Sequence, residues 1–266
     1  MEEDKKTTVS VIPDIITPAS NALQANVPET MKQADGALSS IVGLFNNVVL
    51  YSVKKANITF KYKLEAFEDD LKQKMKSVPK ENIQPPSTMI AGPTLEALRY
   101  AYDEKELREM YENLLASAMD NRKSPKAHPA FVDAIKQMSP LDAEVLNKLV
   151  DLRQVKCATI TFNIKGTTQI YSNGMPNYFI AELYGLADPF LLSASLENLN
   201  RLALIKITDY GLSGIDYNAM MTHIYVKDRE KLFRDNVKED FEINLAERAV
   251  QITNYGEQFA EVCLGK

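Results

Sequence analysis

The sequence predicts a mainly α-helical protein with a small β component: a long N-terminal helix, a central helical bundle and a C-terminal α+β module. Three observations support this prediction: an apolar stripe with an eleven-residue repeat, a succession of amphipathic segments between residues 93 and 152, and an alternating, β-branched run at residues 157–164. With 266 residues, 45% of them hydrophobic, the chain can bury a sizeable core without disulfides or a structural metal.

The first part of the chain predicts a flexible arm followed by one long amphipathic helix. Residues 1–35 are polar and contain three prolines, which is typical of an arm without stable structure. Over residues 36–78, apolar side chains recur with a period of about 3.67 residues and therefore stay on one side of a nearly straight helix. The stripe consists of Leu38, Val42, Phe45, Val49, Val53, Ala56, Phe60, Leu64, Phe67 and Leu71.

A helix of this length would extend for about 60 Å, which is more than a small domain can cover. We therefore expect part of the stripe to pack on the body of the protein and part to meet another copy, making a homo-oligomer. The apolar stretch at residues 36–53 could lie in a membrane interface instead. Asn46 and Asn47 disfavour a spanning helix, and the sequence has no run of about 18 apolar residues.

Residues 79–139 predict a central helical region. Pro93 suits the first turn of a helix that ends near Tyr102, after an extended linker at residues 78–92. A second helix follows Asp103, and a third begins at His128 and Pro129. The side chains expected to face inward are Leu107, Met110, Tyr111, Leu114, Leu115, Ala118, Phe131, Ile135 and Met138.

Residues 140–266 predict an α+β module. Ser139, Pro140 and Asp142 form a strong start signal for a helix that ends near residue 152. The run at 157–164 predicts a strand, with a return at 167–171. Beyond it we expect helices at 177–187, 190–203 and from 254, a β-pair between 205–207 and 223–226, and a short strand at 250–252.

The order of elements over residues 140–227 resembles a winged helix-turn-helix, so the module is expected to be winged-helix-like. DNA recognition would require basic side chains on the helix near residues 195–205. The segment offers only Arg201 and Lys206 as weak candidate contacts, against Glu197. DNA therefore remains an alternative partner that is not favoured, because winged helices also mediate protein contacts.

The sequence contains no recognisable catalytic, cofactor or metal motif. A phosphate-binding GxxxxGK[ST] loop, HExxH, CxxC and GxSxG are all absent, and two distant histidines are too few for a His-rich metal site. We therefore expect a protein that is not an enzyme and needs no cofactor. The two cysteines suit the core of a protein in a reducing compartment, and MEEDKKTTVS lacks the apolar region of a secretory signal, which predicts a cytoplasmic protein.

Four polar residues, Arg108, Asn113, Asp120 and His128, are candidates for a structural network or a partner site. The first three share one helix, on which Arg108 could reach an acid of a neighbouring helix. The favoured interpretation is a half-buried network that fixes how the helices pack. His128 precedes a proline at a helix start, so we interpret it as a capping or packing side chain rather than a general base.

The central runs ELREMYENLLASAMD and AHPAFVDAIKQMSPLDAEVL resemble the abortive infection alpha (Abi-alpha) family of bacteria. The phrases NIQPPSTMIAGPTLEALRYA and ITNYGEQFAEVCLG are also similar to family members, so the resemblance covers most of residues 36–266. It implies a role in phage resistance and supplies no catalytic residues. We expect a non-enzymatic, oligomeric defence protein that contacts a phage or host protein. The alternatives are a DNA-binding regulator and a membrane-active toxic effector.

Overall fold

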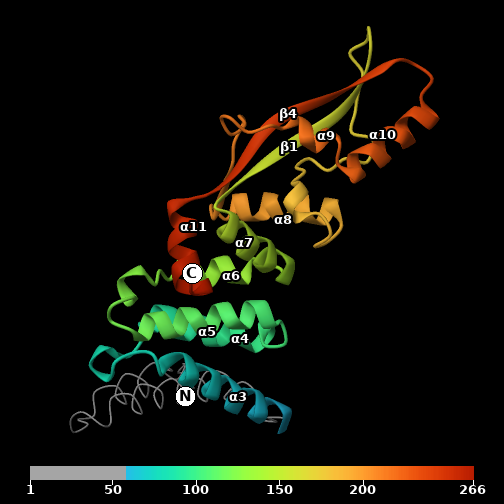
Figure 1. Ribbon diagram of the computed structural model, residues 1–266. Helices are drawn as coiled ribbons and strands as arrows, with labels where there is room; N and C mark the ends of the chain where they lie inside the picture. The colour runs from blue at the N-terminus through green and yellow to red at the C-terminus, as the bar shows by residue number, and fades with distance from the viewer. Residues whose placement is uncertain (1–57) are drawn as a thin grey trace, which may run out of the picture.

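The computed structural model describes residues 58–266, in which helices stack in layers and a β-ribbon extends from one end (Figure 1). The predicted arm at residues 1–35 and the first part of the helix predicted over residues 36–78, up to residue 57, lie outside the described residues. From the N-terminal layer towards the ribbon, the helices are α3 (Ile58–Met75), α4 (Thr88–Ala101), α5 (Lys105–Met119), α6 (Ala130–Lys136), α7 (Pro140–Leu152) and α8 (Pro189–Arg201). The mainly helical fold with a small β component is therefore confirmed.

The start of α7 illustrates how local sequence sets these boundaries. The Asp142 N–H donates to the Ser139 hydroxyl at 3.1 Å, and the Ser139 N–H donates to the Asp142 carboxylate at 2.7 Å. Pro140 occupies the first helical position, where its missing N–H costs nothing. This capping box confirms the helix start that the sequence predicts.

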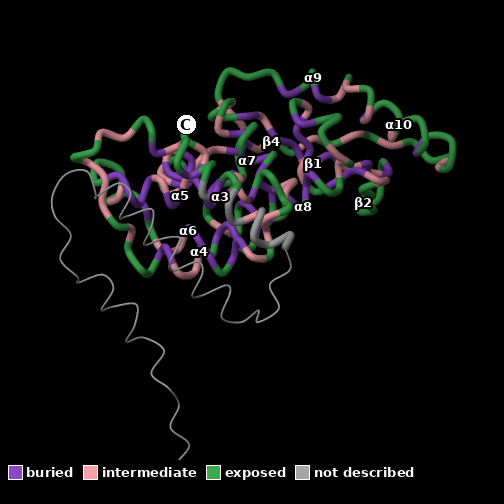
Figure 2. Tube along the Cα trace, turned by 90° about the horizontal axis from the view of Figure 1, so that it is seen from below, coloured by how far each residue is buried: buried purple, intermediate pink, exposed green. Residues whose placement is uncertain are grey.

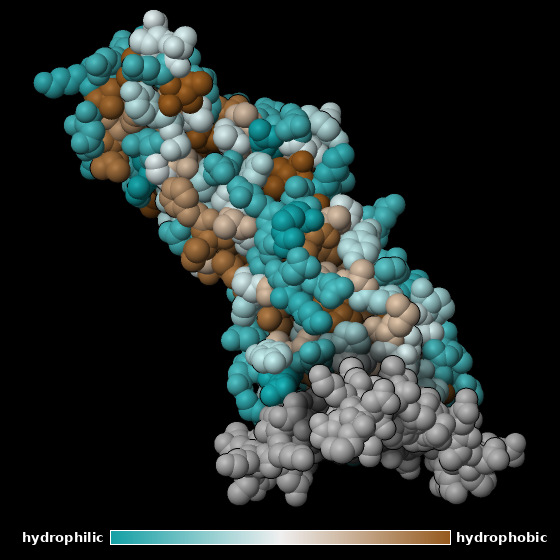
Figure 3. All heavy atoms as spheres, turned by 180° about the vertical axis from the view of Figure 1, so that it is seen from behind, coloured by the Kyte–Doolittle hydropathy of each residue, from teal (hydrophilic) through white to brown (hydrophobic). Residues whose placement is uncertain are grey.

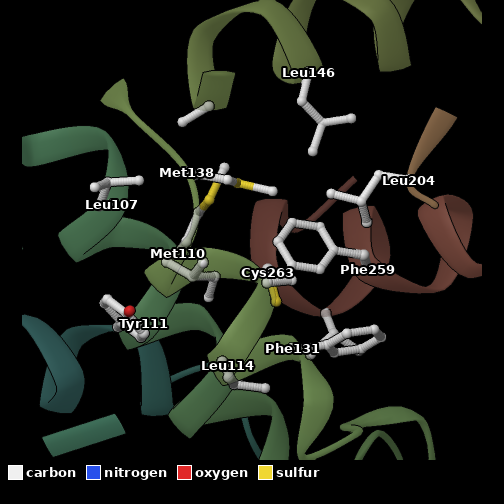
Figure 4. Packing of buried hydrophobic residues seen from close by; sticks show 14 of the residues in the cluster. Leu107, Met110, Tyr111, Leu114, Phe131, Met138, Leu146, Leu204, Phe259 and Cys263 are labelled. Carbon is white, nitrogen blue, oxygen red and sulfur yellow. The ribbon is translucent and has the colours of Figure 1, made fainter. Parts of the chain in front are cut away.

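The helical core is centred on α5. All nine side chains expected to face inward from the central helices are buried, and so are both cysteines. The chain ends in α11 (Asn254–Phe259) and a π-helical turn, η5 (Ala260–Leu264), which pack against α5, α6 and α7. Figure 4 shows Phe131, Phe259 and Cys263 meeting there; the two phenyl rings lie edge to face with centroids 5.2 Å apart.

The sheet has four antiparallel strands in the order β2-β1-β4-β3 among the described residues. Its main part is a ribbon in which β1 pairs with β4 from Gln154↔Gln251 to Ile164↔Phe241. The strand predicted at 157–164 is present, the return predicted at 167–171 is a strand only at residues 170–171, and 250–252 is the end of a longer strand. The bounds are β1 (Gln154–Ile164), β2 (Ile170–Tyr171), β3 (Ile205–Ile207) and β4 (Phe241–Ile252).

The β1–β4 ribbon contributes to two separate cores. Val155 and Cys157 point into the helical core, whereas Ala158, Ile160 and Phe162 belong to a second core. This second core is closed by α9 (Asn218–Met221) and α10 (Ile224–Asn236). Because neighbouring side chains in a strand point to opposite faces, the ribbon exchanges its buried face between residues 157 and 158. Buried residues accordingly continue from the helical body into the ribbon (Figure 2).

Two predicted elements of the C-terminal module are wrong. Residues 177–187 form no α-helix, because Phe179 pairs with Ala158 at the edge of β1 through hydrogen bonds of 3.0 and 2.9 Å. Residues 223–226 form no strand, because the His223 imidazole caps α10 by accepting from the Tyr225 N–H at 3.2 Å. The partner of β3 is therefore β4.

The start of the first central helix is also displaced. Its N-cap is Ser87, whose hydroxyl accepts from the Met89 N–H at 3.3 Å, so Pro93 lies inside α4 rather than in its first turn. The segment predicted as an extended linker contains a short 3-10 helix, η2 (Lys80–Asn82).

Candidate functional site

The least ordinary group in the helical body is a carboxylate on α5 that is buried with little hydrogen bonding. Glu112 is 2% exposed. The Lys74 ammonium from α3 lies 3.6 Å from its Oε2 atom, and the Arg108 Nε atom lies 3.5 Å from its Oε1 atom. Burial raises the pKa of Glu112 to about 7, although the two cations oppose this shift.

Arg108 joins this carboxylate to the turn between α4 and α5. Its Nη1 atom donates to the Tyr102 carbonyl at 2.8 Å, and its guanidinium lies 5.1 Å from the centre of the Tyr102 ring. From α3, the Lys63 ammonium lies 5.3 Å from the centre of the same ring and binds the Asp103 carboxylate at 2.6 Å. These contacts attach α3 to the turn as well as to α5.

Asn113 connects three segments that are far apart in the sequence. Its Oδ1 atom accepts from the Lys74 ammonium at 2.8 Å, and its Nδ2 atom donates to the Cys263 carbonyl at 2.9 Å. One turn later, the Ser117 hydroxyl donates to the Val262 carbonyl at 3.1 Å. Carbonyls at the C-terminal end of a helix lack intrahelical partners, so α5 supplies donors that the terminal helix needs. We call Lys74, Arg108, Glu112, Asn113 and Ser117 the α5 clamp.

A cleft of about 240 Å³ opens beside the clamp, between the ends of α3, α5 and η5. Asp120 lines it and is 1% exposed. The Arg122 guanidinium holds this carboxylate through bonds of 2.8 and 2.6 Å, which keeps the pKa of Asp120 below its usual value. Glu261, which also lines the cleft, accepts from the Lys126 ammonium at 2.6 Å. Both carboxylates of the cleft are thus paired with a cation, and the arrangement suits a structural joint.

The predicted network residues divide into two groups. Arg108 and Asn113 meet in the α5 clamp, and Asp120 lines the adjoining cleft. His128 lies apart and exposed, with its Nδ1 atom accepting from the Ala130 N–H at 3.1 Å, which is a capping contact. Residues 58–266 contain no group of three or more His, Cys, Asp or Glu side chains able to hold a metal.

The other predicted site residues lie elsewhere. Arg201 donates at 2.9 Å to the Gln137 side chain and at 3.1 and 2.7 Å to Asn198, while Lys206 is exposed on β3. Phe67 and Leu71, from the apolar stripe, are buried in the helical core of the same chain. Leu38, Val42, Phe45, Val49 and Val53 lie outside the described residues, and the side chains of Phe60 and Leu64 are not described.

Sequence reasoning missed Glu112 and Lys74, the two charged groups on which the clamp depends. Arg108 and Glu112 are spaced four residues apart, which is the spacing of an ion pair on one helix face and could have been noticed. Nothing local indicates that α3 covers Glu112, because that burial depends on a contact between residues nearly 40 positions apart.

The fold and the clamp define a mainly helical protein whose terminal helix is tied back onto its central helix. The family model described as abortive infection alpha matches residues 59–263, so the chain belongs to this family, as the central motifs indicate. Neither the curated proteins nor the solved structures include a match. None of the helices in residues 58–266 is long and apolar enough to cross a membrane.

Proposed function

We propose that this chain acts in abortive infection as a non-enzymatic protein that binds another protein, from the phage or from the host. Its family supports the defence role. An apolar patch on the surface supports a protein contact, since large exposed apolar patches often mark such contacts.

The apolar patch lies where the 3-10 turn η4 (Ala181–Leu183) leads into α8. Phe190 is 50% exposed and Leu191 is 57% exposed, at the first turn of α8. Figure 3 shows apolar atoms gathered there, midway along the left edge. The Tyr184 ring packs edge-on against His223 with centroids 4.7 Å apart, which brings the start of α10 to the same place. We define the apolar patch as Tyr184, Leu186, Phe190, Leu191 and Ile224, all of them exposed.

The exposed face of α8 suits a protein as its binding partner better than it suits DNA. This helix occupies the place of a recognition helix in the winged-helix interpretation, and its exposed side chains begin with Phe190, Leu191 and Ala194. Further along come Glu197 and Arg201, whose guanidinium is already hydrogen-bonded within the chain. Phosphate contacts need free cations, whereas an apolar face gains by being covered.

The test is phage plaque formation on cells that carry the wild-type gene, the double variant Phe190→Ser/Leu191→Ser, or Met89→Ser. Met89 is 68% exposed on α4 and serves as a matched control outside the patch. We expect the wild type and the control to reduce plaque numbers and the double variant to lose protection while keeping its melting temperature. Full protection by a folded double variant would exclude the patch as the partner surface, and no protection by the wild type would argue against the defence role.

We also propose that the chain forms a homo-oligomer through the N-terminal part of the apolar stripe. Phe67 and Leu71 are covered by the chain's own helices, so the candidate contact is Leu38 to Val53. Multi-angle light scattering on the full chain should give a multiple of the 29.9 kDa monomer mass. The variant Leu38→Glu/Phe45→Glu should give the monomer mass, and a wild-type monomer at high concentration would refute the proposal.

A further inference from the structure

A second surface lies on the opposite side of the helical body from the ribbon, where α3 ends. A groove of about 300 Å³ has Met75, Val78 and Met119 on its floor and Lys72, Lys76 and Lys80 on its rim. The two methionines are buried, at 4% and 0% exposure, so the apolar surface that an occupant can touch comes mainly from the half-buried Val78 and Ile83. We call this feature the lysine-rimmed groove.

The groove is held in shape by backbone hydrogen bonds between two segments. The chain that leaves α3 runs beside the end of α5, where Ile83 forms an antiparallel bridge with Asp120. The Gln84 N–H donates to the Met119 carbonyl at 2.8 Å, and the Asn121 N–H donates to the Asn82 carbonyl at 2.9 Å. An occupant would therefore meet a preformed surface, which lowers the entropic cost of binding.

The rim is cationic on a protein that is acidic as a whole, with a net charge of −5. The Lys76 ammonium donates to the neutral Gln73 side chain at 2.7 Å, and no ion pair with a described residue is found for Lys76 or Lys80. Asp69 lies 3.9 Å from Lys72, and Glu81 follows Lys80 in η2, so the rim is partly but not fully balanced. Lys123, which lines the adjoining cleft, adds a further cation near this side.

We infer that the lysine-rimmed groove binds an acidic amphipathic peptide segment of a partner protein. An apolar side chain of that segment would enter the groove, and its flanking carboxylates would meet Lys76 and Lys80. The groove complements such a segment in both charge and polarity. A nucleic acid would leave the apolar floor without a contact. A membrane surface would favour protruding apolar side chains, and the large exposed apolar residues of 58–266 include none in 72–83 or 119–126.

Fluorescence anisotropy of a labelled peptide tests the inference on the full chain. The probe is a helical peptide of Glu, Leu and Ala with its leucines on one face, and the comparison peptide has alanine in place of each leucine. We expect the wild type to bind the leucine peptide more tightly, and binding to weaken as NaCl is raised from about 0.05 to about 0.3 M. Lys76→Glu/Lys80→Glu should weaken binding at least about tenfold, and Lys76→Gln/Lys80→Gln should weaken it less.

The matched control is Lys231→Glu/Lys238→Glu, which makes the same change of net charge at exposed lysines of α10 and the loop after it. We expect it to bind the probe as the wild type does. Equal losses in both charge-reversed pairs, a wild type that ignores the leucines, or no binding at all would overturn the inference. Tighter binding of phosphatidylglycerol vesicles or duplex DNA through Lys76 and Lys80 would overturn it as well. None of these outcomes depends on the apolar patch or on plaque formation.

Discussion

Glu112 gives the sharpest test of how the α5 clamp works. Its pKa is about 7 in the folded chain, against an ordinary value of 4.5. Between these two pH values the folded protein holds a proton that the unfolded chain has lost. The contribution of Glu112 to the free energy of unfolding is therefore greatest below pH 4.5, falls as pH rises, and is lost above about pH 7. The difference between the two pKa values corresponds to about 3 kcal/mol.

Glu112→Gln removes the titrating proton and keeps the shape of the side chain. We expect the free energy of unfolding of this variant, relative to the wild type, to rise by up to about 3 kcal/mol between pH 5 and pH 8. Urea unfolding followed by circular dichroism at several pH values measures this difference directly. Subtracting the wild-type values removes the contribution of groups that the substitution does not affect.

Glu109→Gln is the matched control, since Glu109 lies on the same helix with its side chain 51% exposed. Its unfolding free energy, relative to that of the wild type, should change much less between pH 5 and pH 8 than that of Glu112→Gln, because solvent screens an exposed side chain. If the unfolding free energies of Glu112→Gln and the wild type instead differ by the same amount at every pH, burial does not keep the Glu112 carboxyl protonated.

Three further predictions concern stability. Asn113→Ala should lower the free energy of unfolding by about 1–3 kcal/mol, because it leaves the Cys263 carbonyl without its side-chain donor; urea unfolding measures the loss, and a neutral result would contradict the bridge. Asp120→Ala should destabilise at pH 7 and progressively less as the pH falls through the acid range, since the lowered pKa of Asp120 means that its stabilising charge is lost there; a pH-independent loss would refute this reasoning. Ser139→Ala should cost about 1 kcal/mol through loss of the capping box, whereas Ser124→Ala, at a 3-10 turn without a side-chain cap, should change thermal stability less.

The parts of the fold that follow from local sequence were predictable. The apolar face of α5 and the capping box of α7 depend on residues within a few positions of one another, and both are present. The strand predicted at 223–226 is wrong, and the cause is again local sequence. A run of four mostly apolar residues cannot be distinguished from the first turn of a capped helix.

The remaining differences arise from contacts between distant segments. Residues 246–249 read Ala-Glu-Arg-Ala, which contains no β-branched or aromatic side chain, and become part of a strand because β1 pairs with them. Residues 177–180 become extended because Phe179 pairs with Ala158. The α5 clamp could be predicted only in part, since Arg108 and Asn113 are recognisable as polar residues on an apolar helix, whereas the burial of Glu112 depends on α3.

The exchange of buried faces in β1 restricts how this family member can change in length. Cys157 and Ala158 are sequence neighbours that belong to different cores. Inserting one residue between them would turn Ile160 and Phe162 towards solvent, and deleting one would do the same. Two inserted residues would restore the alternation. At this point of the ribbon, the fold should therefore tolerate insertions or deletions of an even number of residues only. The exposed turn at residues 165–169 should tolerate insertions or deletions of any small number of residues.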